Sequence, residues 1–235
     1  MTEQVWAIVP AAGNGSRMQA DRPKQYLNLC DKPVIMHTLE RLISHPQIAG
    51  VVVAVADNDP YWSLLAIPAS CPLYRAAGGV ERADSVLNAL NFLKNIADSD
   101  PWVLVHDAAR PCLRHSDIDR MLAELSQDPV GGILGVPVTE TVKRVDPQNR
   151  IIETVSRDNL WRAATPQMFR LQTLLKALEQ TRLAQCKVTD EASAMEYAGY
   201  QPTMVEGHAD NLKITLPNDL ALAALYLQQQ RGDAV

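Results

Sequence analysis

Short apolar runs alternate with amphipathic stretches along most of this chain. The stretches repeat apolar residues at helical spacing, which predicts helices over about 33–45, 86–96, 171–182, 191–198 and 217–227. A further helix is predicted to open with Ser116 as its N-cap and Asp119 three residues later. Four apolar runs are continuous or β-branched enough to predict buried parallel strands, namely Val5–Val9, Val51–Val55, Trp102–Val105 and Ile133–Val138.

This alternation favours an open, doubly wound α/β fold with a mostly parallel sheet, which binds ligands at the carboxyl ends of its strands. The stretch 139–167 interrupts it. Two β-prone segments there, Thr141–Val145 and Ile151–Val155, are joined by Asp-Pro-Gln-Asn-Arg, whose turn residues predict a hairpin. A projecting arm at about 139–163 is too short and polar to hold its own core. We therefore expect its apolar side chains to pack against a partner subunit.

Composition narrows the classes of function. The 235 residues carry 22 Lys and Arg against 27 Asp and Glu, and 47% are hydrophobic, which suits one globular domain over 1–235. A net charge of −5 and an aromatic content of 5% argue against a nucleic-acid surface. The apolar runs fall short of the roughly 20 residues that span a bilayer, and the first residues lack a basic signal segment, so we expect a cytoplasmic protein. The scattered cysteines and histidines lack metal-ligand spacing.

The first predicted strand runs into a turn of small residues, Pro10-Ala-Ala-Gly-Asn-Gly-Ser-Arg-Met18, where an α/β fold usually binds phosphate. Small residues let backbone N–H groups approach an anion, although the spacing matches neither a dinucleotide fingerprint nor a Walker loop. Arg17 and Lys24 lie close by in the sequence, and cations beside such a turn suit a polyphosphate. The alternative is a tight turn without a ligand, beside two solvated cations.

Two further segments carry polar side chains where strands end. In His106-Asp-Ala-Ala-Arg-Pro111, Asp107 could bind a magnesium ion or a substrate hydroxyl, or it could cap the following turn. His106 has no clear acid–base partner, so we interpret it as a packed, hydrogen-bonded residue. Gly78-Gly79 precedes Ser85 where a strand end meets a helix start. That segment could approach a base or ribose, or form only a turn and a helix cap.

Together these segments resemble the 2-C-methyl-D-erythritol 4-phosphate cytidylyltransferases of the non-mevalonate isoprenoid pathway. Seven ordered blocks over nearly the whole chain carry the resemblance. The first two occur in many nucleotidyltransferases, whereas the blocks at 161–167 and 189–193 point to this family. In order, the blocks are Pro10-Ala-Ala-Gly-x-Gly-x-Arg-Met18, Pro23-Lys-Gln-Tyr26, Gly78-Gly-x-x-Arg82-x-x-Ser85-Val86, His106-Asp-Ala-Ala-Arg-Pro111, Leu160-Trp-x-Ala-x-Thr-Pro-Gln167, Thr189-Asp-Glu-Ala-Ser193 and Asn211-Leu-Lys213-x-Thr215.

The resemblance implies a Rossmann-like domain, a homodimer formed through the β-arm, and a reaction of CTP with methylerythritol phosphate that gives the CDP-alcohol and pyrophosphate. It implies that Mg²⁺ is bound mainly through the CTP phosphates, with Asp107 near the ion or joined to it by water. Arg17 and Lys24 would stabilise the transition state. The alcohol phosphate would be positioned by Thr141, Arg157, Thr165, Thr189, Lys213, Asp107 and Arg110. The nucleotide would be bound by Pro10, Ala11, Ala12, Gly13, Gly15, Gly79, Arg82, Ser85 and Ala108.

Two positions depart from the family pattern. Val80 stands where some members have a polar residue, and a contact made by backbone there would be insensitive to the change. Ser16 stands where some members have a second basic residue, which lowers the positive charge of the turn.

The chemistry agrees with these residue types. Attack of a phosphate oxygen on the α-phosphate of CTP brings two anions together, so cations must stabilise the step. A phosphomonoester needs no general base near neutral pH because its second pKa is about 6. One rival is a cytidylyltransferase for another alditol phosphate such as ribitol 5-phosphate, whose glycine turn favours Ala-Gly-Gly over Ala11-Ala-Gly13. The other is a catalytically silent nucleotide-binding regulator, which would not need both Arg17 and Lys24.

Overall fold

A seven-stranded sheet forms the centre of the chain in the computed structural model, which describes residues 5–232 except 14, 16, 17, 19, 69, 70 and 98. The strand order is β11-β7-β10-β6-β1-β4-β5. Neighbouring strands are parallel except that β10 runs antiparallel to both β6 and β7. The predicted mostly parallel α/β sheet is therefore confirmed. The strands are β1 (Val5–Pro10), β4 (Ile48–Val55), β5 (Leu73–Ala77), β6 (Trp102–Val105), β7 (Gly131–Pro137), β10 (Trp161–Arg170) and β11 (Thr203–Glu206).

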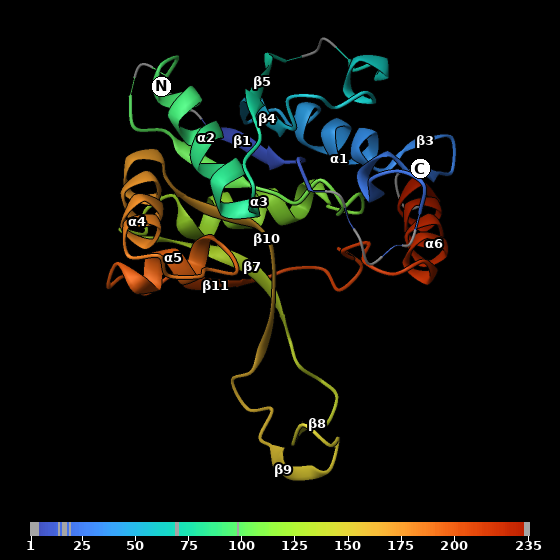
Figure 1. Ribbon diagram of the computed structural model, residues 1–235, viewed down its shortest axis with the longest axis vertical. Helices are drawn as coiled ribbons and strands as arrows, with labels where there is room; N and C mark the ends of the chain where they lie inside the picture. Colours follow the sequence, from blue (N-terminus) through green and yellow to red (C-terminus); the bar gives the residue numbers. More distant parts are fainter. Residues whose placement is uncertain are drawn as a thin grey trace.

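Helices cover both faces of this sheet (Figure 1). Side chains alternate along a strand, so Ala7 and Val9 of β1 pack into one apolar cluster while Trp6 and Ile8 pack into another. Both faces are thus buried, which explains why the strands are continuous apolar runs in the sequence. The first cluster includes helices α1 (Val34–Ile43) and α3 (His115–Leu125), and the second includes α2 (Arg82–Lys94), α4 (Leu171–Leu183) and α5 (Glu191–Tyr197).

The C-terminal helix α6 (Asn218–Gly232) packs beside the sheet, where Ala223 and Leu227 join a third apolar cluster with Val34 of α1. It begins one residue later than the sequence predicts and runs further. Among the described residues, no helix has the length and apolar character that a membrane crossing needs. The short elements outside the central sheet and the arm are the strands β2 (Asn28–Leu29) and β3 (Lys32–Pro33) and the 3-10 helices η2 (Lys24–Tyr26) and η3 (Trp62–Leu64).

One local expectation was wrong. Ser116 is not an N-cap, because α3 begins at His115 with Arg114 as its N-cap, and the N3 residue is Asp117 rather than Asp119. The buried Asp117 carboxylate decides this start, since it accepts hydrogen bonds from the backbone of Arg114 and of His208. A central strand for which the sequence patterns give no prediction is β10, which carries Pro166, a residue without an N–H for the ladder. The structure accommodates it with a register irregularity between Ala163 and Gln167.

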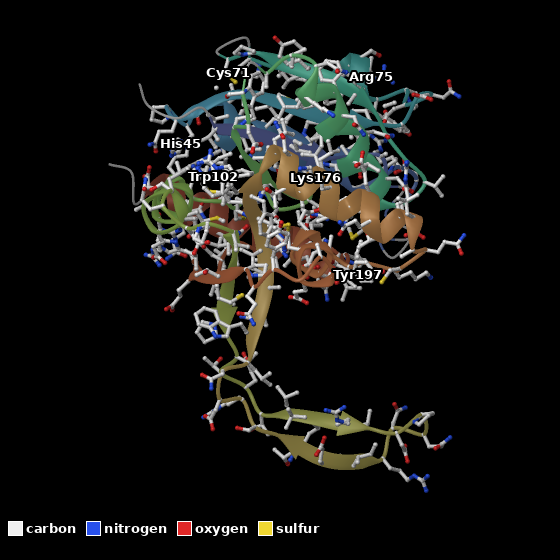
Figure 2. The ribbon with its side chains drawn as sticks, turned by 90° about the vertical axis from the view of Figure 1, so that its left-hand side faces the viewer. His45, Cys71, Arg75, Trp102, Lys176 and Tyr197 are labelled. Carbon is white, nitrogen blue, oxygen red and sulfur yellow. The ribbon has the colours of Figure 1, made fainter. Side chains whose placement is uncertain are left out.

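The predicted hairpin is confirmed: β8 (Val142–Val145) pairs antiparallel with β9 (Ile151–Val155). Figures 1 and 2 show it at the far end of two long segments that leave the sheet through β7 and β10, clear of the rest of the chain. The Asp146 carboxylate closes its turn by accepting 2.9 Å hydrogen bonds from two backbone amides. Three apolar side chains of the arm, Val145, Ile151 and Ile152, are exposed in the single chain.

Candidate active site

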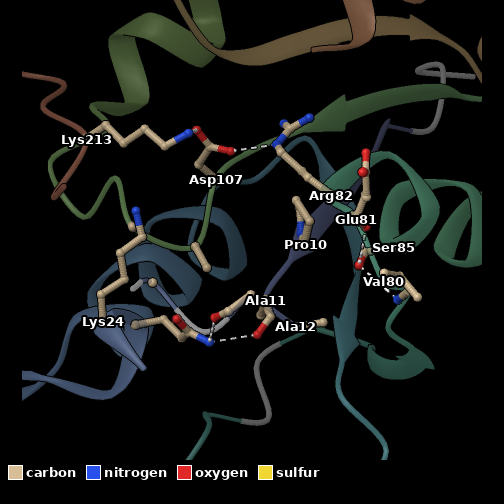
Figure 3. A pocket seen from close by; sticks show the side chains of 16 residues that line it. Pro10, Ala11, Ala12, Lys24, Val80, Glu81, Arg82, Ser85, Asp107 and Lys213 are labelled. Carbon is tan, nitrogen blue, oxygen red and sulfur yellow. Dashed lines mark hydrogen bonds and ion pairs between the residues drawn. The ribbon is translucent and has the colours of Figure 1, made fainter. Parts of the chain in front are cut away.

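A cavity of about 330 Å³ opens at the carboxyl ends of β1 and β6, the edge where this fold class binds ligands (Figure 3). Segments far apart in the sequence line it, from the turn after β1 to the loop that precedes α6. The lining includes three residues predicted to act on the phosphates, Lys24, Asp107 and Lys213. It also includes all nine residues predicted to bind the nucleotide, namely Pro10, Ala11, Ala12, Gly13, Gly15, Gly79, Arg82, Ser85 and Ala108.

The glycine turn is held in place by a side chain for which the sequence predicts no role. Gln25, which is buried, donates from Nε2 to the carbonyls of Ala11 at 2.8 Å and Gly13 at 3.1 Å. Gly15 has a φ of +62°, and a Cβ there would lie 2.8 Å from Cγ of Lys24. Glycine is therefore required both by backbone conformation and by the packing of the lysine stem. The turn and the Lys24 side chain form one packed unit.

The second loop of the cavity, between β5 and α2, is also internally fixed. Gly79 donates its backbone N–H to Ser85 Oγ at 3.0 Å, and that hydroxyl donates to the carbonyl of Glu81 at 3.2 Å. A Cβ at Gly79 would lie 2.2 Å from Cβ of Asp84, so only glycine lets the loop approach the helix start this closely. The loop therefore presents its backbone to the cavity in one defined conformation.

Two lysines reach the cavity from opposite ends of the chain. Lys24 Nζ donates a 2.8 Å hydrogen bond to the carbonyl of Ile214, next to Lys213 in the loop before α6. Figure 3 shows both lysines on the same side of the cavity, across from Arg82 and Ser85. Two ammonium groups at this position suit a ligand with several phosphates.

Asp107 is the centre of an ion cluster at the cavity wall. Its Oδ1 accepts from Arg82 Nε at 3.0 Å, and its Oδ2 accepts from Lys213 Nζ at 2.8 Å and Arg110 Nε at 3.3 Å. Burial by itself would raise the pKa of Asp107, but the attraction of these three cations outweighs it and holds that pKa well below its usual range. Asp107 is therefore a carboxylate at any physiological pH.

Arg82 has a second buried partner that the sequence does not predict. Its two terminal nitrogens bind the carboxylate of Glu191, the first residue of α5, at 2.6 and 3.0 Å. The Glu191 side chain is 1% exposed. Burial lowers the pKa of Arg82, but the attraction of Glu191 and Asp107 is larger in sum and raises it above the ordinary value. The only sequence signal for Gln25 and Glu191 is their place inside two of the seven blocks.

His106 is packed and hydrogen-bonded, as the sequence predicts. The Thr165 hydroxyl accepts from the Asp107 backbone N–H at 3.0 Å, so its single proton is left for His106 Nδ1, also at 3.0 Å. His106 Nε2 then donates to the carbonyl of Arg110 at 3.1 Å. Burial lowers the pKa of His106 to about 4, and the imidazole is neutral near pH 7. Thr165 thus supports the backbone of Asp107 from behind the cavity.

The remaining predicted site residues are spread more widely. Thr189 lies beside Glu191 on a small adjoining cavity that shares Glu81 and Arg82 with the large one. Thr141 and Arg157 are exposed on the arm and are not lining residues of the cavity. The Arg157 guanidinium donates to the carbonyl of Thr139. Arg17 lies outside the described residues.

The contacts of Asp107 decide how a magnesium ion would fit this cavity. In the described part of the chain, no three His, Cys, Asp or Glu side chains are grouped so that they could hold a metal ion. Both oxygens of Asp107 are already occupied by three cationic side chains. Magnesium usually keeps several waters and uses substrate phosphates as ligands, so this cavity suits an ion that arrives on a triphosphate rather than one held in a protein cage.

Comparison with known proteins agrees with this geometry. The family model described as IspD, 2-C-methyl-D-erythritol 4-phosphate cytidylyltransferase, matches residues 5–229. A protein of that name from Pseudomonas aeruginosa (strain UCBPP-PA14) is 57% identical over 216 residues, which are 92% of each chain. Another of that name from Vibrio vulnificus (strain YJ016) is 52% identical over 225 residues, 96% of this chain and 95% of the other.

Solved structures show the same likeness. The crystal structure of 2-C-methyl-D-erythritol 4-phosphate cytidylyltransferase from Francisella tularensis superposes with a TM-score of 0.78 at 38% identity, over 95% of this chain and 99% of the other. A crystal structure of 4-diphosphocytidyl-2C-methyl-D-erythritol synthase superposes with a TM-score of 0.83 at 34% identity, over 97% and 100% of the two chains.

Proposed function

Because this chain belongs to the 2-C-methyl-D-erythritol 4-phosphate cytidylyltransferase (IspD) family, we propose that the cavity at the ends of β1 and β6 is its active site. The enzyme is a CTP-dependent nucleotidyltransferase of the non-mevalonate isoprenoid pathway. It transfers a cytidylyl group to 2-C-methyl-D-erythritol 4-phosphate, which yields 4-diphosphocytidyl-2-C-methyl-D-erythritol and pyrophosphate. The observation that supports this site is the convergence of Lys24, Lys213 and the Asp107 cluster on the glycine turn.

The reaction is a direct in-line displacement at phosphorus. A phosphate oxygen of the methylerythritol phosphate forms a bond to the α-phosphorus of CTP, and the bond from that phosphorus to the oxygen bridging to the β-phosphate breaks. The electron pair leaves with pyrophosphate. No proton has to be removed from the attacking oxygen near neutral pH. The described cavity accordingly needs cations and backbone donors rather than a catalytic histidine, which agrees with a buried, neutral His106.

Each substrate has its own set of cations in this proposal. CTP lies on the backbone of the glycine turn and of the loop at Gly79, with its phosphates beside Lys24 and Arg17. Lys24 meets the charge that builds on the phosphate oxygens in the transition state, and its 2.8 Å hydrogen bond to Ile214 supports that placement. The alcohol phosphate lies toward Lys213, Thr189 and the face of Asp107. Arg110 and Thr165 bind Asp107 without lining the cavity themselves, and they hold it in position.

The arm supplies the rest of the alcohol-phosphate site, from a second subunit. Thr141 and Arg157 are exposed on the arm and do not line the cavity of their own chain. Ile151 and Ile152 of the same arm are more than half exposed. Exposed apolar side chains on such an arm gain stability when a partner covers them. We therefore assign the enzyme to a homodimer in which each arm brings Thr141 and Arg157 to the partner's cavity.

Magnesium enters this proposal on the CTP phosphates, with Asp107 near the ion only through water. The occupied oxygens of Asp107 support this arrangement. Bound magnesium would offset the charge of the triphosphate and of the departing pyrophosphate. A cytoplasmic location is part of the same proposal, and the use of a soluble nucleotide, CTP, supports it.

One assay tests the proposed function. The protein is incubated with CTP and Mg²⁺ and with either methylerythritol phosphate or ribitol 5-phosphate, and pyrophosphate and the CDP-alcohol are measured. We expect both products with methylerythritol phosphate and neither with ribitol 5-phosphate. Equal turnover of ribitol 5-phosphate would contradict the substrate assignment, and CTP binding without any product would favour a regulator.

A further inference from the structure

Glu191 is a buried, charged residue to which the proposed reaction gives no task. Its carboxylate belongs to the first residue of α5, and that turn is fixed to β10 by Gln167, which accepts from the backbone of Ala192 and donates to Asp190, both at 2.9 Å. A buried carboxylate is costly unless it is paired and hydrogen-bonded. The burial of the Glu191 carboxylate on this fixed turn is therefore explained by the group with which it pairs.

That partner is Arg82, which Glu191 holds by both terminal nitrogens. A fork-to-fork pair sets the plane of the guanidinium as well as its position. Arg82 then has its Nε–H left to donate to Asp107 Oδ1 at 3.0 Å. Of the five N–H groups of the guanidinium, three are used in this way, and two remain for a ligand.

The contacts continue from Asp107 to Lys213. Because Arg82 takes only Oδ1 of Asp107, Oδ2 accepts from Lys213 Nζ at 2.8 Å as well as from Arg110 Nε at 3.3 Å. Glu191, Arg82, Asp107 and Lys213 thus form one continuous chain from α5 to the cavity. We propose that Glu191 is a positioning residue, which holds Arg82 edge-on so that Asp107 keeps Lys213 oriented toward the alcohol phosphate.

The alternative pairing shows why this matters. Without the Glu191 charge, the Arg82 fork has one carboxylate left, and an arginine fork binds a carboxylate best through two parallel hydrogen bonds. Arg82 then turns to take both oxygens of Asp107 and displaces Lys213 from Oδ2. The cluster also changes from three cations with two carboxylates to three cations with one. Lys213 then loses its contact with Asp107 Oδ2.

The inference rests on the proposed role of Lys213, and a double-mutant cycle tests it. Wild type, Glu191→Gln, Lys213→Ala and the double variant are compared by kcat and by the KM of each substrate. Glu196→Gln, an exposed site on the same helix, is the matched control. We expect Glu191→Gln to raise the KM of methylerythritol phosphate about tenfold and that of CTP by a smaller factor, because Arg82 is itself one of the residues predicted to bind the nucleotide. In the Lys213→Ala background it adds less than twofold, because the group it positions is already gone.

The outcomes separate this inference from the proposed function. Effects of the two substitutions that multiply would mean that Glu191 does not act through Lys213, and would overturn the inference. An unchanged KM of the alcohol phosphate in Lys213→Ala alone would instead refute the proposed role of Lys213. If circular dichroism shows that Glu191→Gln is unfolded, Glu191→Asp, which keeps the charge but is one methylene shorter, enters the same cycle. Failure of both variants to fold would show that Glu191 serves the fold alone.

Discussion

Lys24 and Ile214 are separated by 190 positions in the sequence, yet the Lys24 ammonium donates a 2.8 Å hydrogen bond to the Ile214 carbonyl. This bond joins the turn that follows β1 to the loop that precedes α6. The backbone N–H of Ile214 donates to the carbonyl of Ala109 at 2.8 Å, which ties the same loop to the segment after β6. This loop therefore holds Lys24 and Lys213 at the same cavity as Asp107.

The first prediction concerns the charge of Lys24. Lys24→Met keeps the stem that packs on Gly15 and removes the ammonium, so the fold should be retained. Loss of a preorganised donor to a developing charge typically costs about 100- to 1,000-fold in kcat, and we expect a decrease of that size in steady-state kinetics. Lys176→Ala, on the exposed side of α4, is the control. A kcat near that of wild type would remove Lys24 from the transition state.

The second prediction concerns Gln25, which holds the glycine turn through two carbonyls. Gln25→Leu removes both donors, and each net hydrogen bond contributes about 0.5–1.5 kcal/mol. We expect the Kd of CTP, measured by calorimetry without the alcohol phosphate, to rise by about tenfold as the turn loosens. Gln172→Leu on the exposed side of α4 should leave it unchanged. Tight CTP binding by Gln25→Leu would show that packing alone fixes the turn.

The third prediction tests whether the active site is shared between subunits. Inactive Lys24→Ala and Arg157→Ala dimers are mixed under conditions that exchange subunits. In a hybrid dimer one site lacks both groups and the other has both, so with random exchange about half of the dimers are hybrids and about a quarter of all sites are intact. Activity should rise toward a quarter of wild type.

A flat result in that experiment is informative once exchange has been verified with differently tagged subunits. If Arg157 served its own chain, every site in a hybrid would lack one group and mixing would restore nothing. A chain that is monomeric by light scattering would also contradict the proposed dimer.

The fourth prediction concerns pH and stability. His106 is buried with its pKa lowered to about 4, so between pH 6.5 and 4 the unfolded chain binds a proton that the folded chain does not. Stability is therefore lost as the pH falls through this window, by up to about 3 kcal/mol from this residue. Burial lowers the pKa of His37 and His45 as well, and they act in the same direction.

Urea denaturation at pH 7 and pH 5 measures this effect. His106→Gln should show a smaller loss of stability between the two pH values than wild type, whatever its absolute stability. The remaining slope would come from His37 and His45. An identical loss in the variant would mean that folding does not lower the pKa of His106.

Local sequence patterns explain part of this fold, and contacts between distant segments explain the rest. Hydrophobic periodicity by itself determined the four parallel core strands and most of the helices, because burial on two faces or one leaves a readable pattern in the sequence. Turn chemistry determined the hairpin at 146–150, and small residues after β1 marked the edge of the sheet where the cavity lies. Seven ordered blocks identified the family.

Only the tertiary structure decided the rest. The antiparallel strand β10 carries Pro166, so its place between β6 and β7 depends on pairing partners far away in the sequence. Glu191 is one acidic residue among 27 Asp and Glu, and nothing local distinguishes a buried partner of Arg82 from a solvated helix start. Hydrogen bonds and ion pairs between distant segments require both groups to be placed by the whole fold. For that reason the sequence named Lys24, Asp107 and Lys213, while the contacts that orient them became visible only once the chain was folded.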